Sequence, residues 1–124
     1  MRGRGFTLSE VLMASTILSI AVAGLLMVFL KTILLNQSSR ELSTATSHVQ
    51  FALEEIRNLD FANVTSQTWN NATIASTGMT PLTNETIVIA VSGTDVLNIN
   101  STVNWFDTGS RRDRSISIET IIVE

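Results

Sequence analysis

The sequence predicts an α+β protein in which a long N-terminal α-helix packs on a small C-terminal antiparallel β-sheet. Three observations lead to this prediction. No ionisable side chain occurs in the twenty residues from Val11 to Leu30. Apolar residues then recur at helical spacing as far as Leu59. The C-terminal third of the chain is β-branched and alternates between apolar and polar residues, which is typical of strands.

The first segment is long enough to cross a membrane. Twenty helical residues at about 1.5 Å each span roughly 30 Å, the thickness of the hydrocarbon core of a bilayer. Glu10 stands at the start of this segment and Lys31 closes it. An ionisable group beside lipid is costly unless it is paired, so Glu10 predicts a functional role. Because no cation lies between Glu10 and Lys31, we expect the partner of Glu10 to come from another chain.

Residues 4–12 read Arg-Gly-Phe-Thr-Leu-Ser-Glu-Val-Leu. This run resembles the class III signal of type IV pilins and type II secretion pseudopilins. The resemblance implies that a prepilin peptidase cleaves between Gly5 and Phe6 and N-methylates Phe6. It also implies that Glu10 sets the assembly register by neutralising the terminal amine of a neighbouring subunit. Two charges that are each costly in lipid offset one another once they are paired.

Two other kinds of N-terminal segment share some of these features. A secretory signal peptide would use Arg2 and Arg4 as its basic region and be cut after Ala23. It would leave an apolar stub on the mature protein. A plain signal anchor explains the hydrophobicity and the basic start. It explains neither Glu10 nor the glycine that precedes Phe6, so we favour the pilin-like signal.

The rest of the helix is predicted to be amphipathic. Its apolar residues recur three and four positions apart, at Leu42, Ala45, Val49, Ala52, Ile56 and Leu59. Residues 1–5 are then the leader, 6–30 the transmembrane and assembly half of the helix, 31–61 its amphipathic half, 62–84 a variable loop and 85–124 the sheet. The loop is rich in Ser, Thr and Asn and predicts little regular structure. We expect Trp69, Ile74 and Met79 to attach it to the sheet.

The expected sheet is a meander of consecutive strands joined by short turns. Thr86 to Val91 is strand-like, and residues 92–95 supply a turn. Val96 to Phe106 alternates, with Leu97, Ile99, Ser101 and Val103 on one face. A polar turn from Asp107 to Asp113 leads to the last alternating strand. The residues of the loop and the sheet are too few to form a large core by themselves. The helix is therefore needed to cover one face of the sheet.

No catalytic or metal-binding pattern is present in the sequence, and we expect neither an enzyme nor a cofactor. Cysteine is absent, and the single histidine, His48, is interpreted as a solvated residue of the helix. The net charge is −3, and losing Arg2 and Arg4 with the leader lowers it by two, to −5. A generally basic nucleic-acid binder is therefore unexpected. The clustered Arg111, Arg112 and Arg114 fit either a solvated turn, which we favour, or a tip that docks DNA or a partner.

These observations predict a minor pilin or a small pseudopilin of a prokaryotic inner membrane. Its N-terminus would be cytoplasmic and its C-terminal domain periplasmic or extracellular before assembly into a filament, at the tip or in initiation. The implied partners are prepilin peptidase, other pilin or pseudopilin subunits, the assembly platform and membrane lipid. The short chain and the missing cysteines favour a minor subunit. The alternatives are a major pilin, and a membrane-anchored DNA- or partner-binding domain of an uptake system.

Overall fold

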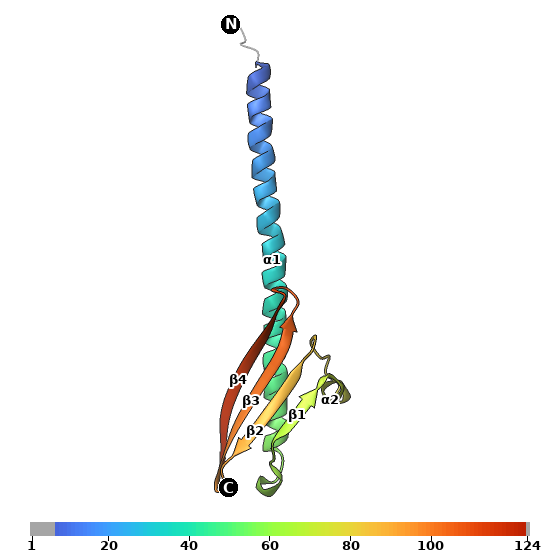
Figure 1. The fold of residues 1–124 in the computed structure, drawn as a ribbon, viewed down its shortest axis with the longest axis vertical. Coiled ribbons are helices and arrows are strands. Elements are labelled where there is room, and N and C mark those ends of the chain that lie inside the picture. The colour runs from blue at the N-terminus through green and yellow to red at the C-terminus, as the bar shows by residue number, and fades with distance from the viewer. Residues whose placement is uncertain (1–6, 124) are drawn as a thin grey trace. The chain divides into compact units, whose positions relative to one another are not determined.

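The structure is a computed structural model that describes residues 7–123. The chain divides into two compact units, Met1–Leu35 and Asn36–Glu124. Helix α1, Leu8–Arg57, contributes its first part to the first unit and its remainder to the second (Figure 1). The other elements, all in the second unit, are η1 (Phe61–Asn63), β1 (Gln67–Asn70), α2 (Asn71–Ser76), β2 (Thr86–Ser92), β3 (Val96–Asp107) and β4 (Arg112–Val123).

The four strands form one antiparallel sheet in the order β1-β2-β3-β4. Each strand pairs with its neighbour in sequence, so the sheet is a meander, as expected. Gly93 allows the β2–β3 turn, because its φ of 106° is unfavourable for residues with a side chain. A Cβ at this position would lie 2.0 Å from the carbonyl oxygen of Val96. The fold is therefore α+β, with a long helix that packs on a four-stranded sheet.

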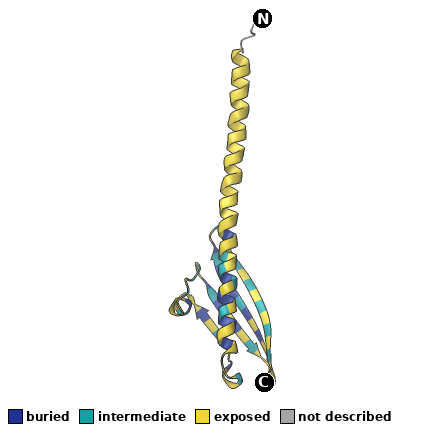
Figure 2. Ribbon diagram, turned by 180° about the vertical axis from the view of Figure 1, so that it is seen from behind, coloured by how far each residue is buried: buried dark blue, intermediate teal, exposed yellow. Residues whose placement is uncertain are grey.

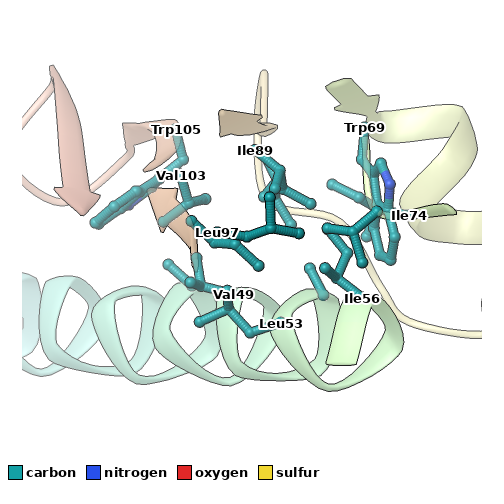
Figure 3. Packing of buried hydrophobic residues seen from close by; sticks show 14 residues of the cluster. Val49, Leu53, Ile56, Trp69, Ile74, Ile89, Leu97, Val103 and Trp105 are labelled. Carbon is teal, nitrogen blue, oxygen red and sulfur yellow. The ribbon is translucent and has the colours of Figure 1, made fainter. Parts of the chain in front are cut away.

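The core of Asn36–Glu124 lies between one face of the sheet and one stripe of α1 (Figure 3). The helix contributes Ala45, Val49, Ala52, Leu53 and Ile56, all buried. Strand β3 alternates as the sequence predicts and buries Leu97, Ile99, Ser101, Val103 and Trp105. The middle of the predicted stripe is thus confirmed, whereas its two ends, Leu42 and Leu59, are exposed.

The segment between α1 and β2 differs from the prediction of little regular structure, because it contains β1 and α2. Asn70 caps α2, since its side-chain oxygen accepts hydrogen bonds from the backbone N–H groups of Ala72 and Thr73 at 3.0 and 3.1 Å. The polar residues that suggested a loop therefore start a helix. As expected, Trp69 and Ile74 are buried and Met79 packs against the core, so all three attach the segment to the sheet.

The β3–β4 turn is shorter than the sequence predicts. Strand β3 continues to Asp107 and β4 begins at Arg112, where these two residues face each other across the ladder. Of the three clustered arginines, only Arg111 lies in the turn, and Arg112 and Arg114 belong to β4. The backbone of Arg111 is left-handed, with a φ of 52°.

Candidate functional site

Glu10 lies in the first turn of α1, where its carboxylate binds Thr7 of the same chain. Its Oε2 atom accepts hydrogen bonds from the backbone N–H and from the hydroxyl of Thr7, both at 2.8 Å. The backbone N–H of Glu10 in turn approaches the Thr7 hydroxyl at 3.4 Å. These reciprocal contacts form a capping box, which satisfies backbone donors that the helix itself leaves free.

From the sequence, the partner of Glu10 was predicted to lie in another chain. The capping box shows that Glu10 also has a partner in its own chain, Thr7. The pattern Thr-x-x-Glu at the start of an apolar run could have indicated this contact from the sequence alone. Within residues 7–123 the structure records no ion pair to Glu10. Both bonds from Thr7 end on Oε2. Among residues 7–123, no recorded hydrogen bond ends on the second carboxylate oxygen, Oε1.

Gly5 and Phe6, the predicted cleavage and methylation positions, lie outside the residues that the structure describes. Thr7 and Glu10 are the nearest described residues of the predicted site. Cleavage between Gly5 and Phe6 and methylation of Phe6 therefore stay predictions.

The first part of α1 is apolar and exposed along its length (Figure 2). Among the described residues, α1 is the one helix with the length and hydropathy to cross a membrane. Its hydroxyl side chains bond back to carbonyl oxygens of the preceding turn. Examples are Thr16 to Leu12 at 2.8 Å and Ser19 to Ser15 at 2.8 Å. These side chains thus need no water, which suits a lipid environment.

The second unit contains a buried contact between a histidine and a glutamate that the sequence did not predict. His48, interpreted as solvated, is only 6% exposed, and its Nδ1 atom lies 2.8 Å from Oε1 of Glu85. The other oxygen of Glu85 accepts the backbone N–H of Leu82 at 2.7 Å. The interpretation of His48 was wrong because the residue opposite it, 37 positions along the chain, depends on the tertiary fold. The pair joins α1 to the segment before β2.

A second polar cluster surrounds Asp107, which is fully buried at the end of β3. Oδ2 of Asp107 accepts the hydroxyl of Ser38 at 2.6 Å and lies 2.8 Å from Nε of Arg114. Oδ1 accepts the backbone N–H of Ser110 at 3.0 Å. Burial raises the pKa of Asp107, but the bonds from Ser38 and Ser110 and the charge of Arg114 outweigh it and hold the pKa at about 2. The cluster fixes the β3–β4 turn to α1.

Asp107 is expected to make the second unit sensitive to acid. Its pKa is lowered on folding, so its contribution is present above about pH 4 and is lost as the pH falls toward about 2. Asp107→Asn should lower the free energy of unfolding by roughly 1–3 kcal/mol at neutral pH, as for other charged hydrogen bonds. Below about pH 2 the gap to wild type should shrink, since the wild-type carboxyl is then protonated as well.

Denaturant unfolding of both chains across this pH range measures the effect. Asp113→Asn is the matched control, because Asp113 is exposed on the same hairpin. A gap between Asp107→Asn and wild type that does not change with pH would contradict this role of the carboxylate.

No group of three or more His, Asp or Glu side chains in residues 7–123 is arranged to hold a metal ion. The described contacts of the second unit, the His48–Glu85 pair and the Asp107 cluster, join structural elements to one another. The candidate functional site is therefore the N-terminal segment, with Glu10 at the start of an exposed apolar helix.

Comparison with protein families matches residues 1–26 to the family described as "Prokaryotic N-terminal methylation motif". The match includes Gly5, Phe6 and Glu10, and it ends before the second unit begins. It supports a pilin- or pseudopilin-type protein that is a substrate of prepilin peptidase. Together with the apolar helix it also supports membrane anchoring. Neither the curated proteins nor the solved structures compared with the chain gave a match.

Proposed function

We propose that this chain is a minor pilin or pseudopilin subunit that is cleaved between Gly5 and Phe6, methylated on Phe6 and assembled into a filament. The observation that supports this most is the spacing of features within the matched residues 1–26. Helix α1 begins two residues after Phe6, and Glu10 lies in its first turn. The compact second unit gives such a subunit a domain outside the lipid.

Assembly in this proposal depends on charge and on packing. The terminal amine of cleaved Phe6 is a cation in an apolar environment, and so it needs a counter-charge. Glu10 of an adjacent subunit supplies it, while Thr7 holds that carboxylate at the start of its own helix. The exposed apolar residues of α1 pack against lipid before assembly and against other subunits afterwards. The N-terminus stays cytoplasmic, and the second unit lies on the opposite side.

A major pilin differs from this proposal in abundance alone, which sheared filaments would reveal. A DNA-docking domain is less well supported by the described contacts, because Arg114 is engaged by Asp107. Only Arg111 and Arg112 of the predicted cluster are then exposed and free of a carboxylate in residues 7–123.

Mass spectrometry of the mature N-terminus tests the processing step. The membrane-bound chain should begin at Phe6 and carry one added methyl group. Gly5→Val should leave the precursor uncleaved, because the peptidase must accommodate this residue next to the scissile bond. Gly3→Val makes the same substitution within the leader and should still be processed. A mature chain that begins at Gly24 would overturn the proposal and indicate ordinary secretion.

A further inference from the structure

Two exposed arginines, Arg111 and Arg112, lie at the end of the second unit where its chain begins. Two contacts place the β3–β4 turn there. The hydroxyl of Ser38 bonds Asp107, and the backbone N–H of Thr108 donates to Oε2 of Glu41 at 3.2 Å. Ser38 and Glu41 belong to the first residues of the unit Asn36–Glu124. The turn is therefore held beside the point at which the unit is joined to the apolar segment.

The covalent chain limits how far this turn can lie from a membrane that contains the apolar helix. The predicted transmembrane half of the helix ends at Leu30, and Ser38 follows it by eight residues. Eight residues span at most about 29 Å when fully extended, and only about 12 Å along a helix such as α1. This limit holds at any angle between the two units. Once the helix is inserted, the β3–β4 turn stays near the headgroup layer.

Charge is distributed unevenly over the second unit. Arg40, Arg111 and Arg112 are exposed at the end that carries the β3–β4 turn, with Glu41 and Asp113 as nearby acids. The opposite end has a single exposed cation, Arg57. Its exposed acids are Glu54, Glu55, Asp60 and Asp95. The protein is acidic as a whole, so the excess of cations at the turn is a local feature.

The backbone at Arg111 gives an independent reason to look for a role outside folding. Its φ of 52° lies in the left-handed region, where glycine or asparagine is the favourable choice. An arginine in this conformation is disfavoured, and its exposed side chain makes no recorded contact within residues 7–123 that would compensate. A residue held against the preference of the backbone is a candidate for function.

We propose that Arg111 and Arg112 bind the phosphates of anionic phospholipids in the leaflet from which the helix emerges, and so orient the second unit on the membrane before assembly. Two arginines give only weak binding in free solution. The anchor, however, keeps them at a high effective concentration next to the headgroups, so weak attraction suffices. Each arginine near an anionic surface strengthens docking about fivefold. DNA has no such tether, and two contacts are few for binding it.

This inference rests on the proposed membrane anchoring, which is checked separately by retention of the full chain in nanodiscs of phosphatidylcholine. Cleavage of the leader is not needed for the measurement, so a failure of processing does not affect it. The chain has no cysteine, so Thr108→Cys gives a single site for a fluorophore in the turn. Thr94→Cys in the β2–β3 turn labels the opposite end. Quenching by phosphatidylcholine with a nitroxide on its headgroup reports proximity to the membrane surface.

At about 0.1 M salt, the label at position 108 should be quenched more strongly when about a third of the lipid is phosphatidylglycerol, and the label at 94 should not. At about 1 M salt the difference should disappear, because the charges are screened. Arg111→Gln should lower the ratio of docked to undocked protein about fivefold, and Arg111→Gln with Arg112→Gln about 25-fold. Arg57→Gln removes the same charge at the other end and should leave the ratio unchanged.

Equal quenching at position 108 in the two lipid mixtures would overturn the proposal. So would an equal decrease in the ratio of docked to undocked protein on Arg57→Gln and on Arg111→Gln. The salt titration of the otherwise unchanged labelled chain gives the same test without any arginine substitution, so misfolding of a variant cannot decide it. Saturable binding of duplex DNA by chain in phosphatidylcholine discs, abolished by the double substitution, would also overturn it. The arginines would then be assigned to nucleic acid.

Discussion

Replacing Ile56 with aspartate is expected to unfold the unit Asn36–Glu124. Ile56 is 1% exposed and packs in the core between α1 and the sheet. A buried carboxylate without a partner costs several kcal/mol. Small domains are stable by only about 5 to 15 kcal/mol, so this cost removes much or all of the stability. Loss of the cooperative thermal transition in circular dichroism, with little protection from hydrogen exchange in β2 and β3, is the expected result.

The matched control is Gln50→Asp, which places the same carboxylate on the exposed side of the same helix. It should change the melting temperature little, since surface substitutions usually alter stability by less than about 0.5 kcal/mol. Ile56→Val removes one methylene and should cost about 0.5–1.5 kcal/mol. If Ile56→Asp melted at the wild-type temperature, the apolar stripe of α1 would have to face outward, and the proposed core would be wrong.

The structure also suggests where a fragment for these measurements should begin. The hydroxyl of Ser38 is bonded to Asp107, so a start at Ser39 would remove one of the groups that stabilise this buried carboxylate. A start at Asn36, the first residue of the second unit, keeps the contact. We expect the fragment from Asn36 to be the more stable of the two.

Glu10→Gln is expected to preserve the subunit in the membrane while reducing its incorporation into filaments by about a hundredfold or more. A neutral glutamine enters lipid more easily than a carboxylate, so the membrane pool should be unchanged or larger. In the proposed filament, the substitution would leave the Phe6 amine of a neighbour without its counter-charge. Breaking one half of a buried pair costs about 3–5 kcal/mol, and about 1.4 kcal/mol corresponds to tenfold in an equilibrium.

The capping box supplies a control that separates charge from geometry. Glutamine still has an oxygen that can accept the N–H and hydroxyl of Thr7, so Glu10→Gln removes the charge and keeps the cap. Thr7→Val removes the capping hydroxyl and keeps the charge, and should cost only about 1 kcal/mol of local helix stability. Quantifying processed subunit in membranes and in sheared filaments compares the two. If only Thr7→Val prevented assembly, Glu10 would act through the helix start instead of through its charge.

Much of the fold could be predicted because its signals are periodic and local. The spacing of Ala45, Val49, Ala52 and Ile56 identifies one helical face, and the alternation in β3 identifies one face of a strand. Strand β1 could not be predicted in the same way. It is four residues long, and it is stabilised by pairing with Thr86–Ile89, about twenty positions further along the chain. The local composition of this segment therefore indicates a loop, and tertiary pairing decides otherwise.

In the candidate site and the polar residues discussed above, too, local features could be predicted and those that depend on the tertiary fold could not. Gly5, Phe6 and Glu10 form a local motif, so the sequence alone was enough to propose it, and the family match covers the same residues. The capping box is equally local, because Thr7 and Glu10 are three positions apart. The burial of His48 and Asp107 could not be predicted, because each depends on a side chain brought opposite by the fold. Glu85 is the residue brought opposite His48, and Ser38 is the residue brought opposite Asp107.

The order of elements in the second unit has a consequence for how the domain is made. Its helix comes first along the chain and the sheet that covers it follows, strand by strand, ending with β4. A nascent chain therefore presents the apolar stripe Ala45–Ile56 to water before β2 and β3 have emerged to cover it. Ser38 likewise lacks Asp107, its hydrogen-bond partner, until another 69 residues have been made. During this interval the half-made domain is open to aggregation and to chaperone binding.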